Sequence, residues 1–184
     1  MFRRSLRVAV CLFLCGMLYA AEQSGVWLDV PFIAQEKNAC GAASIAMVMQ
    51  YWEHQQEKPA SADAKQIQRS IYSPLAQGIY ASDMKLYLEQ HGYRTVAFPG
   101  EWKDLKEHLE KGRPLIVALK AGQRDLHYVV VAGLDFAQGM VLKNDPAERK
   151  LLKQNRSSFE KQWKAAGSWT LLAVPQQDDQ SSSQ

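Results

Sequence analysis

Cys40 is the residue of this chain whose type and position best suit covalent chemistry. The sequence has three cysteines, and the other two lie within residues 1–20, a segment with the features of a removable export signal. Once that signal is removed, Cys40 is the single thiol of a protein bound for an oxidising compartment, where an unpaired thiol is liable to oxidation. Its retention needs a chemical reason, and we interpret Cys40 as a nucleophile.

The residues around Cys40 favour the reactive form of its thiol. The sulfur belongs to the first turn of a predicted helix, where the positive end of the helix dipole and unpaired N–H groups stabilise a thiolate. Gly41 has no side chain and permits a substrate backbone to approach closely. A loop glutamine is ordinarily just polar, but beside this cysteine we assign Gln35 a role. Its side-chain amide and the Cys40 N–H are placed to bind the oxyanion of a tetrahedral intermediate.

A thiol needs a base to act as a nucleophile at neutral pH, and the sequence offers four histidines. His54 lies far along the same predicted helix, about 21 Å from Cys40 at 1.5 Å per residue. His91 falls at a helix C-terminus, and His108 falls on a polar helix where we expect it to be solvated. His127 begins an apolar strand, where a polar side chain needs a buried partner. We therefore predict His127 as the base, in preference to a core histidine that binds only backbone.

Hairpin geometry indicates which acid orients His127. The strands predicted at 127–134 and 140–143 are joined by a short turn and form a β-hairpin. In the register that follows, Asp145 lies opposite Val129, on the same face as His127 and one diagonal step away. Diagonal neighbours of this kind are within side-chain reach. We therefore predict that Asp145 orients the imidazole.

Two nearby residues are alternatives to Asp145. A slip of one residue in the register would bring Asn144 to the same place. An asparagine can also orient a catalytic imidazole, so the mechanism survives such a slip. Asp135 belongs to the turn between the strands and is better explained by turn chemistry.

The elements that position these residues form one α+β domain in two halves. In the first half a short strand is predicted at 26–33 and helices at about 40–53, 63–71, 82–91 and 101–111, the third of them capped by Ser82 and Asp83. The helix that begins at Cys40 is apolar nearly all round, which predicts that it is buried. Strands at 114–120, 127–134, 140–143 and 168–174 fill the second half. We expect the cysteine helix to pack on their antiparallel sheet.

The two ends of the chain differ from its middle. Three arginines, an apolar run and small residues predict a signal peptide at 1–20, cleaved near Ala20. The apolar run is shorter than the roughly 20 residues of a transmembrane helix, so we expect no stable membrane span in the mature form. Residues 176–184 have no apolar side chain and are predicted to be a disordered polar tail. The remaining residues, 21–175, are predicted to form the domain.

Charge and ligand spacing exclude two classes of partner. Removal of the three signal arginines takes the 22 basic and 19 acidic residues to 19 of each, so the mature chain is near neutral. It has no basic patch with interleaved aromatic residues, and we expect no nucleic-acid partner. One cysteine and scattered histidines lack the spacing of zinc ligands, so we expect no metal and no cofactor.

Four motifs follow one another along the chain: Gln35, then Cys40-Gly41-Ala42-Ala43, then the run from His127 to Asp135, then Asn144-Asp145-Pro146-Ala147. In this order and spacing they resemble the papain-like peptidases that process bacteriocins. That family includes stand-alone secreted members and the peptidase domains of ABC exporters, which cut leader peptides after a double glycine. The likeness spans roughly Trp27 to Pro175.

The resemblance implies a papain-like cysteine peptidase fold. Carried over residue by residue, it implies Cys40 as the nucleophile, His127 as the base, Asp145 as the orienting acid and Gln35 as the oxyanion donor. It also implies a bacterial source, hence a periplasmic or secreted protein. The exporter domains usually have an acid just before the cysteine, where this chain has Ala39, and this leaves open whether the double-glycine preference is kept.

Three functions remain open at this point. The first is an exported cysteine endopeptidase that acts on a peptide or protein, leader peptides included. The second forms the same acyl-enzyme but passes the acyl group to another acceptor, as a peptidoglycan amidase or a transpeptidase. The third is a catalytically silent module that binds a peptide. The set Gln35, Cys40, His127 and Asp145 favours an enzyme, because a binding module has no chemical need for all four.

Overall fold

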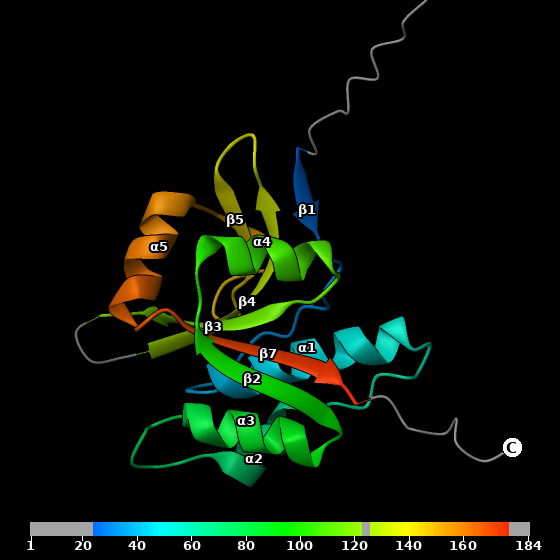
Figure 1. Ribbon diagram of the computed structural model, residues 1–184. Helices are drawn as coiled ribbons and strands as arrows, with labels where there is room; N and C mark the ends of the chain where they lie inside the picture. Colours follow the sequence, from blue (N-terminus) through cyan, green and yellow to red (C-terminus); the bar gives the residue numbers. More distant parts are fainter. Residues whose placement is uncertain (1–23, 123–125, 177–184) are drawn as a thin grey trace, which may run out of the picture.

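The computed structural model describes residues 24–122 and 126–176 as a sheet with helices on both faces (Figure 1). The elements in chain order are β1 (Gly25–Trp27), α1 (Cys40–Gln55), α2 (Ala64–Ile71), α3 (Ala81–Gln90), β2 (Tyr93–Pro99), α4 (Trp102–Glu110), β3 (Leu115–Lys120), β4 (Leu126–Asp135), β5 (Met140–Asn144), β6 (Leu152–Asn155), α5 (Arg156–Ala165) and β7 (Trp169–Pro175). The predicted α+β class is confirmed, because helices dominate the first half and antiparallel strands the second.

The ends of the chain fall largely outside the described residues. The predicted signal peptide at 1–20 lies wholly outside them. Of the predicted tail at 176–184 the structure describes Gln176, whose N–H donates to the Gly92 carbonyl oxygen at 2.9 Å. The boundaries 21–175 therefore stay a prediction. Between residues 24 and 176, the described helices include none that is long and apolar enough to cross a membrane.

Within the described residues, seven strands form one antiparallel sheet. The order is β2-β7-β3-β4-β5-β6, and β1 pairs with β4 outside this path. The central strands β3 and β4 are buried at nearly every position, because helices cover both faces. Alternate side chains enter different cores. Ile116 and Val130 pack with α1, whereas Val117 and Val129 pack with residues of α4 and α5.

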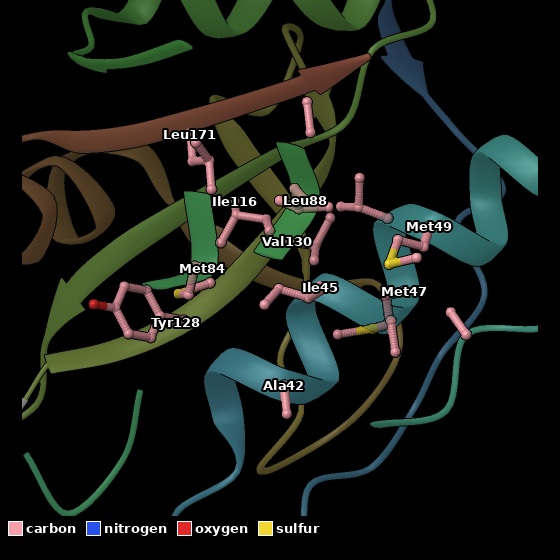
Figure 2. Packing of buried hydrophobic residues seen from close by; sticks show 14 of the residues in the cluster. Ala42, Ile45, Met47, Met49, Met84, Leu88, Ile116, Tyr128, Val130 and Leu171 are labelled. Carbon is pink, nitrogen blue, oxygen red and sulfur yellow. The ribbon is translucent and has the colours of Figure 1, made fainter. Parts of the chain in front are cut away.

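The helix α1 packs against the sheet and supplies much of one core. Ten of its sixteen residues are buried, and it contacts β4, β3 and β7 on one side and α2 and α3 on the other. Figure 2 shows Ile45 of α1 pointing toward the strands that carry Ile116 and Val130. The predicted buried helix is therefore confirmed. Its packing fixes the position of the residue at its start, Cys40.

Several elements differ from the sequence predictions. The strand predicted at 26–33 ends at Trp27, and the predicted cap at Ser82 and Asp83 is wrong, because Tyr80 is the N-cap of α3 and no side chain caps the helix. The strands β2 and β6 and the helix α5 were not predicted. β2 and β6 are the two ends of the sheet order and expose many of their side chains, so no apolar run indicates them.

Candidate active site

Cys40 is the first residue of α1 and is half-buried. The preceding residue, Ala39, supplies no side-chain cap, and the first turn of the helix contains no acidic residue. The N–H groups of that turn therefore lack the acceptor that a capping side chain provides. The Gly41 N–H, together with the Tyr128 N–H from β4, donates to the Cys40 sulfur. Both hydrogen bonds stabilise the thiolate more than the thiol.

Gly41 has a packing role. It is buried, and a Cβ atom at this position would lie 3.3 Å from Ile79 Cβ and 3.4 Å from the Met84 sulfur. The missing side chain lets the start of α1 pack closely against α3 and the loop before it. The approach of a substrate backbone at Gly41 stays a prediction.

His127 lies in β4, opposite Leu119 of β3. Its Nε2 atom is 2.7 Å from Asp145 Oδ1, and the ring also forms a hydrogen bond with the Cys40 side chain. Since the carboxylate occupies Nε2, the contact with sulfur uses Nδ1. Cys40, His127 and Asp145 thus form a continuous chain of hydrogen bonds from α1 to the β4–β5 hairpin.

Cys40 and His127 shift each other's protonation in opposite directions. Burial alone would raise the pKa of the Cys40 thiol, but hydrogen bonds from His127 and from the Tyr128 N–H outweigh burial and lower that pKa. Burial alone would lower the pKa of His127, but hydrogen bonds with Asp145 and Cys40 raise it to about 9. The arrangement therefore favours the charged pair, thiolate and imidazolium, over the neutral pair.

A β-bulge determines which residue of the hairpin reaches His127. Close to the turn Asp135 pairs with Met140, and this register, continued along the strands, would turn Asp145 to the opposite face of the sheet. Further along, one extra residue of β4 shifts the pairing by one. Asp145 therefore lies opposite Val129, on the face of His127, in agreement with the register expected from the sequence.

Asn144, the alternative left open by the sequence, has other contacts. Its side chain is fully buried, and Nδ2 donates to the carbonyl oxygens of Val30 at 3.0 Å and Pro31 at 3.2 Å. Its Oδ1 accepts from the Leu151 N–H at 2.9 Å. Asn144 thus joins the segment before α1 to the turn after β5, and it holds these two segments instead of the imidazole.

Asp145 is shared between several donors. Its Oδ1 accepts from His127 and, at 3.1 Å, from the Ala147 N–H, while Oδ2 lies 2.8 Å from Lys143 Nζ. Burial alone would raise the pKa of the Asp145 carboxyl, but the hydrogen bonds from His127 and Lys143 hold it well below its usual range. The sequence analysis missed Lys143. The available signal was a charged residue within an apolar strand, two positions before the predicted acid.

Gln35 lies in the loop before α1, and its backbone is fixed beside the acid. The Gln35 N–H donates to the Pro146 carbonyl oxygen at 2.8 Å, and its half-buried side chain has a buried Oε1 atom without a hydrogen-bond partner among the described residues. Gln35 also lines a cavity of about 370 Å³, together with Ala39 and Ala43 of the α1 region. This cavity lies next to the residue that precedes Cys40.

The other three histidines lie elsewhere. His54 is exposed in the last turn of α1, and His91 stacks on Tyr87 with its Nδ1 atom 2.7 Å from the Tyr87 carbonyl oxygen. His108 is half-buried beside the Phe98 ring, so the expectation that it is solvated is wrong. Burial, together with the charge of a neighbouring arginine, lowers the pKa of His108. Of the four, His127 is the one that meets the cysteine.

The sequence of residues 27–170 matches the model of the Peptidase_C39 like family. The chain belongs to this family. It is therefore a cysteine-type peptidase, a hydrolase, and the resemblance seen in its motifs is confirmed. A search among curated proteins found no match.

Solved structures of low sequence identity share the fold. A C39-like peptidase from Bacillus anthracis has a TM-score of 0.67 at 20% identity, over 84% of this chain and 99% of the other. A double glycine motif protease from an AMS/PCAT transporter, in complex with its leader peptide, has a TM-score of 0.64 at 23% identity, over 82% and 94%. Xylellain, a cysteine protease from Xylella fastidiosa, has a TM-score of 0.62 at 12% identity, over 84% and 87%. The papain-like fold expected from the sequence is confirmed.

Proposed function

We propose that this peptidase hydrolyses peptide bonds with Cys40 as the nucleophile, His127 as acid and base, and Asp145 as the residue that orients His127. The observation that carries the proposal is the chain of hydrogen bonds from Cys40 through His127 to Asp145 Oδ1. The lowered pKa of Cys40 and the raised pKa of His127 provide a nucleophile and an acid together.

The reaction begins when the Cys40 thiolate attacks the carbonyl carbon of the scissile bond. The carbonyl oxygen becomes an oxyanion, and we assign the Cys40 N–H and the Gln35 side-chain amide as its donors. His127 then gives its Nδ1 proton to the leaving amine, and a thioester remains on Cys40. Water attacks the thioester while His127 takes up its proton, which releases the acid product and regenerates the enzyme.

Gln35 is assigned to the oxyanion on the basis of its setting. Its backbone is held by Pro146, the residue after Asp145, and it precedes Cys40 by a short turn in which the Ala39 N–H donates to the Glu36 carbonyl oxygen. A single oxyanion donor typically contributes about 10²- to 10³-fold in rate. We therefore expect Gln35→Ala to lower kcat by this factor.

The proposed substrate is a peptide or protein, with leader peptides as the first class to test. The double glycine motif protease that shares this fold was solved in complex with a leader peptide, which supports this choice. We also propose export to the periplasm or the exterior of a bacterial cell. Support comes from the arginines, apolar run and small residues within positions 1–20.

Peptide hydrolysis by the chain without residues 1–20 tests the proposal, with Cys40→Ala as the matched inactive variant. We expect cleavage by the parent protein and none by the variant. Added amines then distinguish hydrolysis from acyl transfer, since they compete with water for the thioester and the ratio of the two products can be measured. Predominant transfer to the amine would replace hydrolysis by a transferase function. Cleavage that persists in Cys40→Ala would contradict the proposal.

A further inference from the structure

Lys143 is a buried cation in direct contact with the site. Its side chain is 7% exposed and its Nζ atom lies 2.8 Å from Asp145 Oδ2, on a carboxylate side chain that is 4% exposed. In the other ion pairs of the described residues, every lysine side chain is at least 39% exposed. This lysine is therefore exceptional within the described part of the chain.

The strand β5 explains how the ammonium reaches the carboxylate. Lys143 lies in β5 and Asp145 directly follows its last residue, so the two are two positions apart, the spacing at which side chains of an extended chain share a face. Within the sheet, Lys143 pairs with Val131 of β4 and Leu152 of β6, so its backbone neighbours are apolar. Asp145 Oδ2 is the carboxylate atom that the ammonium contacts.

Stability alone is a poor reason for such a lysine. Removing an ammonium from water costs several kcal/mol, and a well-packed apolar side chain in place of a buried charged one is often equally stable. The partner carboxylate would still be paired, since Asp145 Oδ1 accepts from His127 and from the Ala147 N–H. The contact instead affects His127, because it changes the orientation and the effective charge of the carboxylate that His127 binds.

We propose that Lys143 is a positioning residue, which fixes the carboxylate of Asp145 toward His127 and shares its negative charge so that the imidazolium can release its proton to the leaving amine. This inference rests on the proposed function. With Oδ2 held by the ammonium, the carboxylate cannot rotate away from the imidazole. With its charge divided between two cations, Asp145 stabilises the imidazolium less strongly through Nε2, so the ring gives up its Nδ1 proton to the amine more readily.

The charges that face His127 make the direction of the effect clear. The thiolate of Cys40 from α1 and the carboxylate of Asp145 are balanced by the imidazolium of His127 and the ammonium of Lys143. The Tyr128 phenol adds no charge, because burial raises its pKa to about 12. Without the ammonium the group carries an excess negative charge, which favours the imidazolium and raises the pKa of His127.

The test compares three variants by the pH dependence of kcat and kcat/KM. Lys143→Met keeps an unbranched side chain, one atom shorter, and removes its charge. Lys143→Arg keeps the charge, and Lys153→Met on β6 is the exposed control. We expect Lys143→Met to move the alkaline limit upward by about 1 pH unit and to lower kcat by about 10-fold, with KM unchanged. Lys143→Arg should have the alkaline limit of the parent, and Lys153→Met should match the parent in kcat and in both pH limits.

A readout without turnover separates this inference from the proposed function. The imidazole C–H resonance of His127, followed by NMR across the same pH range, reports ring protonation even if no peptide is cleaved. An upward shift of the His127 titration in Lys143→Met supports the inference. If Lys143→Met has a lower Tm but an unshifted His127 titration, Lys143 has only a structural role and the inference is wrong. If Lys143→Met does not fold, Lys143→Gln, which keeps an N–H donor to Oδ2 without the charge, gives the same decision.

Discussion

At the scale of single residues, the proposed chemistry depends on the protonation states of Cys40 and His127. The same hydrogen bond lowers the pKa of Cys40 and raises that of His127, because each charged form stabilises the other. Hydrogen bonds from the N–H groups of Gly41 and Tyr128 further stabilise the thiolate, and the hydrogen bond with Asp145 stabilises the imidazolium. These contacts thus favour the thiolate–imidazolium pair over the neutral pair.

This charge distribution predicts the pH dependence of kcat/KM. The acid limit follows protonation of Cys40 and should lie below the usual range of a cysteine thiol, about 8.5. The alkaline limit follows loss of the imidazolium proton, so activity should fall as the pH rises through about 9. Steady-state kinetics from pH 4 to 11 measures both limits. A rate that simply increases through the range of a free thiol would contradict the ion pair.

The acid of the site gives a second prediction. Asp145→Ala removes the group that orients His127 and leaves the Lys143 ammonium buried without its partner, so both kcat and stability should fall. Asp145→Asn is the cleaner variant, because an amide oxygen can still accept from the imidazole. We expect kcat to fall by about 10²-fold or more in Asp145→Ala, and less in Asp145→Asn. Asp135→Ala is the control, and equal activity of all variants would exclude the assignment.

At the scale of elements, the site depends on one helix start and one hairpin. The position of α1 was predictable, because an apolar run on all sides of a helix indicates burial, and the run begins at Cys40. The hairpin was also predictable from two apolar strands and a short turn. The bulge in β4 was not predicted, although Gly133, which borders it, is a residue type that often marks a bulge within a strand, and the bulge keeps Asp145 on the face of His127.

Lys143 shows a different limit of sequence reasoning. A lysine within a strand is usually solvated, and its neighbour Asp145 was assigned to His127 alone. The contact of Lys143 with the second carboxylate oxygen of Asp145 can be inferred only once β5 is known to lie between β4 and β6, where the Lys143 side chain is buried. The edge strands β2 and β6 were missed for a related reason, because partial exposure removes the apolar signal.

The contacts of the hairpin predict that substitution of Asn144 lowers stability, whereas substitution of Asp145 lowers activity. Asn144→Ala leaves the Val30 carbonyl oxygen and the Leu151 N–H without their partners, which should cost about 1–3 kcal/mol of unfolding free energy. Chemical denaturation measures this loss. The pH limits of the folded variant should stay where they are in the parent, and Gln66→Ala, at an exposed position, should change stability by about 0.5 kcal/mol or less. Shifted pH limits in Asn144→Ala would mean that Asn144 acts on His127 after all.

At the scale of the whole molecule, the site lies where two layers meet. The proposed nucleophile, Cys40, is the first residue of α1 in the helical first half, and His127 and Asp145 come from the strand-rich second half, so neither half contains the candidate site alone. The order of the motifs along the chain was enough to indicate the family. It could not give the substrate, because substrate choice depends on the surface around the cleavage site and not on the reacting groups.

The proposed export belongs to the same scale and is tested on the chain that includes residues 1–20. Expression in a bacterial host should yield a mature protein that begins after Ala20 or Ala21, because the arginines, the apolar run and the small residues fit a signal peptide. The intact mass of the exported protein measures the cleavage position. A mass that retains Met1, or one that includes a lipid on Cys15, would contradict export by this route.

The central claim, that Cys40 attacks a peptide carbonyl with the help of His127, is tested most directly by an irreversible thiol-reactive peptide probe. Mass spectrometry of the labelled protein identifies the modified residue, and the labelling rate is compared between the parent and His127→Ala at pH 7. We expect one adduct, on Cys40, and labelling slowed by about 10²-fold or more in His127→Ala. Equal rates in the two proteins, or peptide cleavage by Cys40→Ala, would contradict the claim.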